Sequence, residues 1–402
     1  MWKNLLLLLL IILTISLTPK KTEAYSLADR LSGYILLEVE ANGEAWYVYP
    51  NNLNRYYLGR PDDAFKIMRT LGLGATHSFI TSQTIFPSYV SGKILLDVET
   101  NGEAYYINPR TRTKHYLGRP ADAFAVMRQL SLGITTSNLS QIPMSTLSSA
   151  TTDTSGVSNY EEKQLTVSGV TYDIKIASVD LLASNLEIIT DTASNTDCAN
   201  DCPVKSLVDY VQSNNGFLAI NGSYFCPTEY ASCATTKNYF FYPVYNSRLG
   251  TMINNDQLKW PTTGPILVFD TSNKPYFFTS TQTFKDVATF EALYKTKISA
   301  AIANKPALIH NYSNIISSAE LDDKQRTVKS YRSALGLKDN KIFLVVASNA
   351  TVIDLAGIMK SLDMEHVMNL DGGGSTALYY QGVYKVGPGR NLPNALIFKI
   401  KN

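Results

Sequence analysis

Residues 369–378 read Asn-Leu-Asp-Gly-Gly-Gly-Ser-Thr-Ala-Leu, and the apolar run that leads into them begins at His366. Three consecutive glycines cost backbone entropy, so they indicate a turn with unusual backbone angles or a close approach of the backbone to another group. Successive backbone N–H groups in such a turn can hold an anion. The stretch therefore predicts a strand that ends in a carboxylate, Asp371, beside an anion-binding loop. A purely structural turn is the alternative.

Three further motifs lie at the edges of apolar, strand-like segments. They read Asn221-Gly222-Ser223-Tyr224-Phe225, then Tyr331-Arg332-Ser333-Ala334-Leu335-Gly336, then Gly389-Arg390 with Pro393-Asn394-Ala395-Leu396. Loops held in place by a rigid sheet commonly carry functional side chains. Together with residues 369–378, and in this order, the motifs resemble the phosphodiester glycosidase family, which includes the lysosomal enzyme that uncovers mannose 6-phosphate. The resemblance covers roughly residues 165–402.

The resemblance implies hydrolysis of a sugar-1-phosphate diester, in which the C1–O bond breaks to leave a free sugar and a phosphomonoester. We expect catalytic roles for Asp371, Asn221 and Arg332. We expect substrate-binding roles for Arg390, Gly372, Gly373, Gly374, Ser375, Thr376, Tyr224 and Asn394. The substrate is then a phosphorylated carbohydrate. We assign no cofactor and no metal ligands, with a divalent cation as the alternative.

The chemistry of these side chains suits such a substrate. Arginine holds phosphate oxygens bidentately, so Arg332 and Arg390 would grip the phosphate, unless each only forms an ion pair. Asp371 would act as acid or base, or would stabilise the positive charge that develops at C1. Because a phosphate leaving group needs little protonation, a single catalytic carboxylate is chemically reasonable.

The sequence departs from the family pattern around the expected pocket rim. The usual Gly-rich turn before Pro-x-Leu reads Ala303-Asn304-Lys305-Pro306-Ala307-Leu308, and Ser348-Asn349-Ala350 stands where a glycine is common. The loop after Phe225 is longer and contains Cys226, Pro227 and Cys233. These departures put the identity of the substrate in doubt more than the class of reaction.

Two other functions fit parts of the sequence. A serine hydrolase would use Ser375 with His310 or His366. However, a nucleophile elbow requires a helix after the serine, and residues 377–384 are aromatic and strand-like. A non-catalytic surface protein would use its large domain only to hold glycan, but the joint presence of all four motifs argues against it.

The N-terminus carries Lys3, then an apolar run from Leu5 to Leu17, then Thr22-Glu23-Ala24. The run is short for a membrane span and fits a signal peptide over residues 1–24, with an uncleaved anchor as the alternative. The rest of the sequence has no second apolar run long enough to cross a bilayer. We therefore expect a secreted protein or one associated with the cell envelope.

The four cysteines form two close pairs in the sequence, and in an exported chain they predict structural disulfides. Local pairing, Cys198 with Cys202 and Cys226 with Cys233, is our expectation among three connectivities. A four-thiolate zinc site is the alternative, although neither spacing is the usual Cys-x2-Cys. A net charge of +2 without a Lys/Arg cluster argues against a nucleic-acid partner.

Residues 32–134 contain two tandem repeats spaced 59 residues apart, and residues 33–74 and 92–133 are identical at 25 of 42 positions. Each unit is expected to form a hairpin, a short strand and a helix. The residues that indicate this are the turns Asn42-Gly43 and Asn101-Gly102, the helix starts Pro61 and Pro120, and the buried helical pairs Phe65/Met68 and Phe124/Met127. Because one unit buries little surface alone, we expect the pair to pack together.

The repeated aromatic pairs Trp46/Tyr47 and Tyr105/Tyr106 either fill two small cores or form a face that stacks on sugars. The repeats are of an envelope type, so a cell-envelope ligand is their expected partner. Residues 135–163 are rich in Ser and Thr and predict a solvated linker that leaves the repeats separable from a catalytic domain over residues 164–402. The fold class is therefore α+β, with a mixed β-sheet flanked by helices in the catalytic domain.

Overall fold

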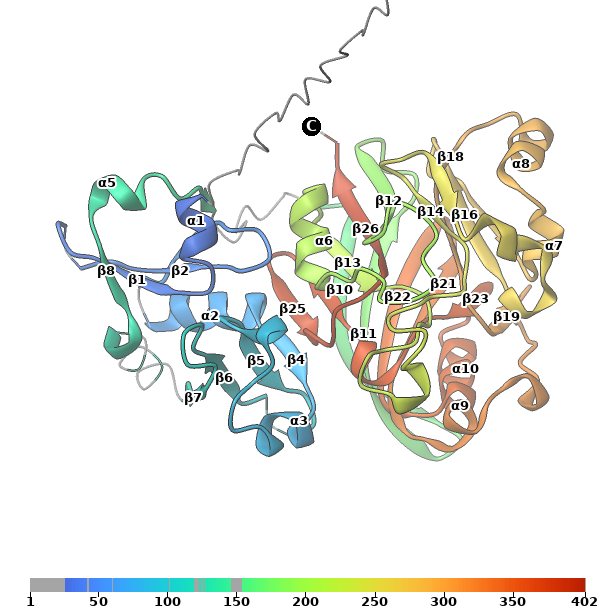
Figure 1. Ribbon diagram of the computed structural model, residues 1–402. Helices are drawn as coiled ribbons and strands as arrows, with labels where there is room; N and C mark the ends of the chain where they lie inside the picture. Colours follow the sequence, from blue (N-terminus) through green and yellow to red (C-terminus); the bar gives the residue numbers. More distant parts are fainter. Residues whose placement is uncertain are drawn as a thin grey trace, which may run out of the picture.

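The computed structural model describes residues 26–41, 43–59, 61–100, 102–118, 123, 126, 128–145 and 154–401. An N-terminal part and a larger C-terminal part lie side by side (Figure 1). The expected signal peptide (residues 1–24), Asn42, Asn101, Pro120, Phe124, Met127 and the side chains of Pro61 and Phe65 lie outside the described residues. Among the described helices, none has the length and apolar character that a membrane span requires.

The N-terminal part consists of short strands and helices in two similar series. The first series is α1 (Leu27–Arg30), β1 (Ile35–Glu38), β2 (Ala45–Val48), β3 (Arg55–Tyr57), α2 (Pro61–Leu71) and β4 (Leu73–Ala75). The second is α3 (His77–Ser82), η1 (Ser88–Val90), β5 (Ile94–Asp97), β6 (Ala104–Ile107), β7 (Lys114–Tyr116) and β8 (Leu132–Ile134), followed by α5 (Thr136–Leu139) and β9 (Met144–Ser145).

Each repeat contributes its last strand to the sheet of the other repeat. β4 pairs in parallel with β5, and β8 pairs in parallel with β1. The hydroxyl of Tyr47 donates to the carbonyl of Gly92 (2.7 Å), and the hydroxyl of Tyr106 donates to the carbonyl of Gly33 (2.8 Å). This exchange explains physically why a single unit would be incomplete.

The two members of each repeated aromatic pair differ in burial. Tyr47 and Tyr106 are buried, so these two rings fill the core of the N-terminal part. Trp46 packs against the exposed Tyr57, with ring centroids 5.0 Å apart, and Tyr105 packs equivalently against Tyr116 at 5.3 Å. Only these outer rings are placed where a ligand can reach them.

The C-terminal part is built on antiparallel sheets. One has the strand order β10 (Ser158–Val167), β11 (Val170–Asp180), β22 (Lys341–Ala350), β21 (Ser330–Lys338), β23 (His366–Asn369), β19 (Ala307–His310), β20 (Ser313–Asn314). A second runs β12 (Leu186–Thr192), β26 (Asn394–Ile400), β13 (Leu218–Asn221), β24 (Leu378–Tyr380), β25 (Val383–Val386). A third runs β15 (Thr251–Ile253), β14 (Val244–Asn246), β18 (Ile298–Ala303), β16 (Ile266–Asp270), β17 (Pro275–Phe278).

Helices and short 3-10 turns connect the strands of these sheets. The longer ones are α6 (Leu207–Asn214), α8 (Val287–Tyr294) and α10 (Val352–Ser361), and the shorter ones are η2 (Ala231–Cys233), η3 (Asn255–Lys259), η4 (Pro261–Thr263), α7 (Thr281–Phe284), η5 (Ser318–Glu320), α9 (Asp323–Thr327) and η6 (Gly373–Ser375). An apolar core that includes Leu344 and Phe398 lies between the sheets. The α+β class is therefore confirmed.

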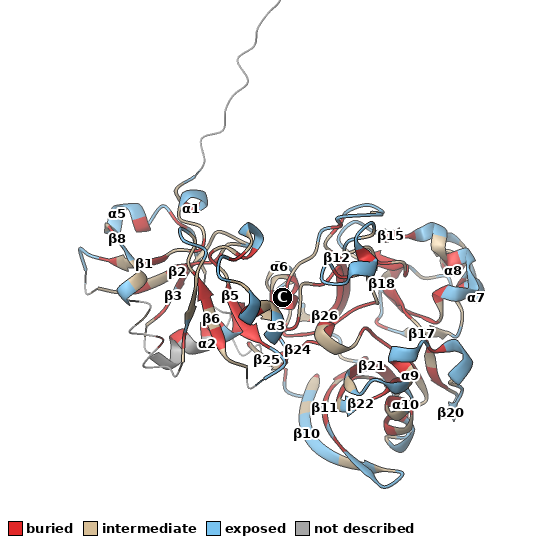
Figure 2. Ribbon diagram, turned by 60° about the horizontal axis from the view of Figure 1, so that its bottom comes forward, coloured by how far each residue is buried: buried red, intermediate tan, exposed pale blue. Residues whose placement is uncertain are grey.

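The expected linker is partly structured, which corrects the boundary at residue 164. α5 and β9 lie within it, and β10 begins at Ser158 and pairs with β11 along its whole length. Most of β10 is exposed, so its sequence is polar and does not show the apolar alternation that reveals a strand (Figure 2). Of the expected linker, residues 146–153 lie outside the described residues.

The two parts share one apolar cluster, a contact that the polar linker did not predict. Tyr49 and Tyr56 of the first repeat belong to the same cluster as Tyr210 of α6 and Tyr379 of β24. β25 lies against the N-terminal part in Figure 1 and contacts α2. A low apolar content in the linker does not limit this contact, because the shared surface comes from the folded elements on either side of it.

A backbone contact joins the first repeat to the segment that carries Arg390. The N–H of Gly74 donates to the carbonyl of Gly389 (2.8 Å), and a Cβ on Gly74 would lie 2.5 Å from that carbonyl oxygen. At the equivalent position of the second repeat, a Cβ on Gly133 would meet only the Val39 side chain, at 3.2 Å.

We expect Gly74→Ala to destabilise the protein by about 1–3 kcal/mol, because the new methyl group must displace backbone rather than a flexible side chain. Gly133→Ala is the matched control and should have little effect, since the end of Val39 can move. Denaturant unfolding of the full chain measures both variants. Equal stabilities of the two variants would contradict the described contact between the parts.

Candidate active site

Asp371 lies where the ends of three strands meet. It follows β23, and its N–H donates to the carbonyl of Gly222, just beyond β13 (3.0 Å). Its own carbonyl accepts hydrogen bonds from Asn221 Nδ2 (2.8 Å) and from Ser333 Oγ of β21 (2.7 Å). Motifs that are far apart in the sequence are thereby brought to one place at the edge of two sheets.

Asn221 is fully buried and fixes both ends of the glycine loop. Besides its bond to the carbonyl of Asp371, its Oδ1 accepts the N–H of Ala377 (3.1 Å). The side chain has no exposed surface with which to touch a substrate. The catalytic role expected for Asn221 is therefore corrected to a positioning role.

The carboxyl group of Asp371 is itself almost completely buried, with 7% of the residue exposed. Its Oδ1 accepts the N–H of Gly372 (2.8 Å). Burial raises its pKa to about 6, against the opposing effects of the Ser375 hydroxyl, the Arg390 charge, the Gly372 N–H and the Arg332 charge. At neutral pH this carboxyl group is mostly ionised, but its pKa lies close to that pH. Such raised pKa values are common at catalytic sites.

The glycine loop forms a tight 3-10 turn, η6, beside this carboxyl group. Gly373 has a positive φ of 62°, and the N–H of Thr376 donates to its carbonyl (3.0 Å). Among the described residues, the N–H groups of Gly373 and Gly374 have no hydrogen-bond partner. Two adjacent free N–H groups with a left-handed residue form the kind of concavity that binds anions.

Arg390 reaches this loop from the segment before β26. Its N–H donates to the carbonyl of Gly374 (2.9 Å), and its Nη1 lies 3.4 Å from Ser375 Oγ. Nε is 3.7 Å from Glu229 Oε1, and the guanidinium lies 5.5 Å from the ring centre of Tyr230. The weak ion pair at an exposed carboxylate leaves the guanidinium able to bind a phosphate.

Arg332 is placed differently. Its Nε donates to the carbonyl of Ala350 (3.2 Å), and its Nη2 donates to the carbonyls of Lys324 (3.0 Å) and Val328 (2.7 Å). A Cβ on Gly372 would come within 3.0 Å of its Nη1. Arg332 therefore supports the glycine loop and supplies a positive charge. It cannot bind phosphate bidentately, because its Nε and Nη2 already donate to backbone carbonyls.

Tyr224 presents a protonated hydroxyl to the site. Its oxygen accepts hydrogen bonds from Asn369 Nδ2 (2.7 Å) and Gln325 Nε2 (3.0 Å). Burial, and secondarily the Asp371 charge, raise its pKa to about 12. Because both of those neighbours donate, the hydroxyl proton is left for an acceptor such as a substrate oxygen.

Three other expected binding residues lie inside the protein. Asn394 is fully buried and its Oδ1 accepts the N–H of Ser223 (2.9 Å), so it supports the loop after β13. Ser375 is fully buried, and Thr376 Oγ1 donates to the carbonyl of Tyr331 (3.4 Å). The structure corrects the contact roles of Asn394 and Thr376 to structural ones, because their polar atoms are already occupied.

The structure adds residues that the motifs did not single out. Asn304 is fully buried, accepts the N–H of Tyr224 (2.9 Å) and donates to the carbonyl of Asn369 (2.9 Å). It lies in the segment that departs from the family pattern. Ser333 comes directly after Arg332 in the sequence, but only Arg332 was assigned a role there. Glu229 lies in the cysteine loop, where the sequence offers no signal for it.

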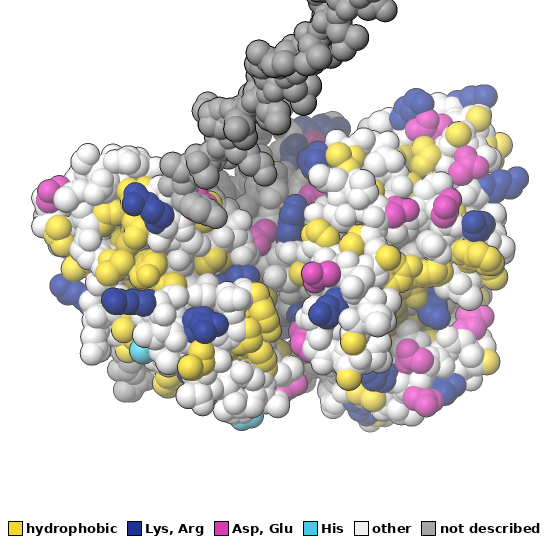
Figure 3. Space-filling view, in the orientation of Figure 1, with side chains coloured by type: hydrophobic (Ala, Val, Ile, Leu, Met, Phe, Trp, Pro, Cys, Tyr) yellow, Lys and Arg dark blue, Asp and Glu magenta, His cyan; other side chains and the backbone are white. Residues whose placement is uncertain are grey.

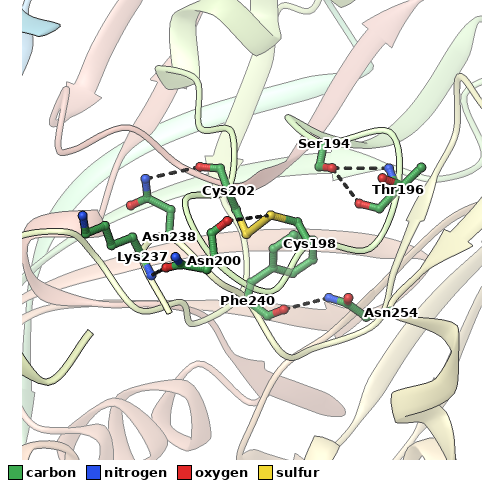
Figure 4. The surroundings of a disulfide bond; sticks show 9 residues. All are labelled: Ser194, Thr196, Cys198, Asn200, Cys202, Lys237, Asn238, Phe240 and Asn254. Carbon is green, nitrogen blue, oxygen red and sulfur yellow. Dashed lines mark hydrogen bonds between the residues drawn. A yellow bond between two sulfur atoms is a disulfide. The ribbon is translucent and has the colours of Figure 1, made fainter. Parts of the chain in front are cut away.

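Both expected disulfides are formed. Cys198 pairs with Cys202 and Cys226 pairs with Cys233, and among the described residues no cysteine is free. Figure 4 shows the first bridge, with Asn238 Nδ2 donating to the carbonyl of Cys202 (3.3 Å). The second bridge closes the loop that carries Glu229. Both thiol pairs are oxidised, so the four-thiolate zinc alternative is wrong.

The surroundings of Ser375 do not support a serine nucleophile. No group of three His, Cys, Asp or Glu residues within the described ranges is arranged to hold a metal ion. His310 and His366 stack on each other with ring centroids 4.8 Å apart, and both stack on Phe277. Strand β24, not a helix, follows Ser375. The strand–serine–helix turn that a serine hydrolase requires, the nucleophile elbow, is therefore not formed at Ser375.

Comparison with known proteins agrees with this geometry. Residues 215–399 match the phosphodiester glycosidase family. The match contains all four motifs, so the resemblance read from them is confirmed over this part of the chain. No protein with a curated description matches the sequence.

Solved structures show weaker likeness. The zebrafish N-acetylglucosamine-1-phosphodiester alpha-N-acetylglucosaminidase catalytic domain, auto-inhibited by its pro-peptide, is 16% identical, with 61% of this chain and 83% of that chain covered and a TM-score of 0.46. A hypothetical protein from Synechocystis is 12% identical, with 61% of this chain covered and a TM-score of 0.44. The chain spans 62% of the length of the Synechocystis protein.

The buried carboxyl group predicts a stability effect that does not depend on substrate. The folded-state pKa of Asp371, about 6, lies above the ordinary value of 3.8, so its ionised form destabilises the fold above pH 6 and the cost disappears below pH 3.8. Asp371→Asn should therefore be more stable than the wild type at about pH 8, by on the order of 3 kcal/mol, and equally stable at about pH 3. Denaturant unfolding at both values tests this, and a less stable variant at the higher pH would contradict the burial.

Proposed function

We propose that the protein hydrolyses the C1–O bond of a glycosyl-1-phosphodiester and releases a free sugar and a phosphomonoester. One observation carries this proposal: a buried carboxyl group, Asp371, lies beside two free N–H groups and the guanidinium of Arg390. An anion cradle next to a carboxylate suits a substrate that has a phosphate on one side of the scissile bond and a cationic centre on the other.

The residues divide the work as follows. The N–H groups of Gly373 and Gly374, with Arg390, hold the phosphate and stabilise the charge that it gains as the C1–O bond breaks. Ionised Asp371 stabilises the positive charge that develops at C1. The hydroxyl of Tyr224 donates a hydrogen bond to a substrate oxygen. Because the leaving phosphate is a weak base, no general acid is required.

We also propose that the protein acts outside the cytoplasm, on envelope or extracellular glycans. The two disulfides support this, because such bonds persist in oxidising compartments. On the face seen in Figure 3, acidic and basic side chains are interspersed over the C-terminal part, and mainly basic ones are visible on the N-terminal part. A glycan-binding protein without catalysis explains the site less well, since binding alone does not need a carboxylate that costs stability when ionised.

The test is release of reducing sugar from methyl diesters of glucose 1-phosphate, galactose 1-phosphate and N-acetylglucosamine 1-phosphate by the full chain. We expect kcat/KM on the accepted diester to rise through about pH 6 and to stay level above it, because Asp371 must be ionised. A rate that falls as the pH rises through 6 would instead show that the protonated carboxyl acts as a general acid. Turnover of none of the diesters would count against the proposal.

A further inference from the structure

A polar hollow of about 500 Å³ lies between the first repeat and α6, away from the glycine loop. Its walls come from the turn between β2 and β3, from Lys93 before β5, from α6 and from the segment that follows Arg390. The amide side chains that line it are Asn51, Asn52, Asn54, Gln212 and Asn391. Hollows of this size hold small ligands, and amides both donate to and accept from hydroxyl groups.

A cation and a carboxylate line the same hollow. Asp209 Oδ2 accepts a hydrogen bond from Asn51 Nδ2 (2.8 Å) and caps the first turn of α6 through Ser206. Burial lowers the pKa of Lys93, and the Asp209 charge opposes this. Within the described part of the chain, no hydrogen bond or ion pair reaches Lys93 Nζ. An acceptor and a donor side by side suit the neighbouring hydroxyls of a sugar.

One acceptor in the wall is left unsatisfied. Asn391 Oδ1 is buried and has no hydrogen-bond partner among the described residues. A buried acceptor without a partner has lost its hydrogen bonds to water and gained none in the protein, which destabilises the fold. A ligand hydroxyl in the hollow would donate to it and remove that cost.

The second repeat shows that the amides are not required by the turn itself. Leu53 and Arg112 occupy equivalent positions with φ of 59° and 57°, so the two turns share one backbone geometry. The first turn carries Asn51, Asn52 and Asn54 where the second carries Arg110, Thr111 and Thr113. Only the amide-bearing turn faces α6, where Asn52 Nδ2 donates to Gln212 Oε1 (3.3 Å).

We propose that this hollow is a carbohydrate-binding site that takes a neutral, hydroxyl-rich sugar unit of a glycan. Lys93, Asp209 Oδ1 and the side-chain amides of Asn54 and Asn391 supply donors and acceptors to its hydroxyls. Asn51 and Asn52 hold the wall in place through their bonds to Asp209 and Gln212, and Asn391 gains its missing partner. The site requires no cleavage and so goes beyond the proposed function. A glycan held there bridges the first repeat and α6, and tethers the protein to a polymer.

The test is calorimetric titration of the full chain with maltotriose, with triacetylchitotriose and with inorganic phosphate. At least one trisaccharide should bind at millimolar concentration. Lys93→Met and Asn54→Ala should each weaken that binding by about tenfold. Thr113→Ala, the equivalent change in the second repeat, should leave it unchanged. The melting temperature of each variant confirms that it is folded.

Three results would overturn the proposal. One is the absence of binding by both trisaccharides at millimolar concentration. Another is binding of phosphate in preference to the sugars, which would make the hollow an anion site. The third is trisaccharide binding that survives both hollow variants but is lost in Asp371→Asn, which would place the sugar in the active site. Trisaccharide binding without any diester turnover would support this site while rejecting the proposed reaction.

Discussion

Asp371→Asn is expected to lower kcat/KM on a glycosyl-1-phosphodiester by about 10³-fold or more while the protein stays folded. The amide keeps the volume of the carboxyl group, and its oxygen can still accept the N–H of Gly372, now 2.8 Å away. What is lost is the negative charge opposite C1, in a buried position where charge acts strongly. Reducing-sugar release measures the rate, and circular dichroism confirms the fold.

Ser375→Ala is the matched control for this prediction. Ser375 interacts with the Asp371 carboxyl group and lowers its pKa, so the variant should keep most of the activity and shift the acidic limb of the pH profile upward. Activity near the wild-type level in folded Asp371→Asn would remove the role assigned to the carboxylate. Complete loss in Ser375→Ala, with activity retained in Asp371→Asn, would favour a serine nucleophile instead.

Arg390→Lys is expected to lower kcat/KM by about 10²-fold, although the charge is unchanged. A lysine cannot bind two phosphate oxygens with parallel N–H groups. Its single ammonium group also cannot contact Ser375 and Glu229 in the way that Nη1 and Nε of Arg390 do. Steady-state kinetics on the same diester measure the effect.

Glu229→Gln provides the control for Arg390. The carboxylate is 3.7 Å from Arg390 Nε and half exposed, so its removal leaves the guanidinium in place. We expect activity within a few-fold of the wild type. A larger loss in Glu229→Gln than in Arg390→Lys would show that the carboxylate, rather than the guanidinium, contacts the substrate.

The sequence predicted where the site residues lie along the strands, but not which of them face the substrate. Asp371, Arg390 and the glycine loop were correctly placed together, because each is at the end of an apolar strand. Asn221 looks equally suitable in the sequence and proves to be buried. The direction of a side chain beyond a strand end depends on how two sheets meet, and one sequence does not contain that information.

The N-terminal part shows a similar limit. Local signals predicted hairpins, because Gly43 and Gly102 lie between alternating apolar runs, and the described strands agree with them. The pairing of β4 with β5 and of β8 with β1 is not local, so no repeat period reveals it. The contact between Gly74 and Gly389 joins residues far apart in the chain. A glycine in a strand does not by itself predict which residue lies against it.

Hydrolysis of an accepted diester in ¹⁸O-labelled water tests the central claim most directly. If the C1–O bond breaks, water attacks the sugar, and mass spectrometry should find the released phosphomonoester without label. Phosphomonoester that carries one ¹⁸O would show that water attacks phosphorus and that the P–O bond breaks. That result would contradict the role of Asp371 at C1 and the assignment of the glycine loop and Arg390 as a cradle for a leaving phosphate.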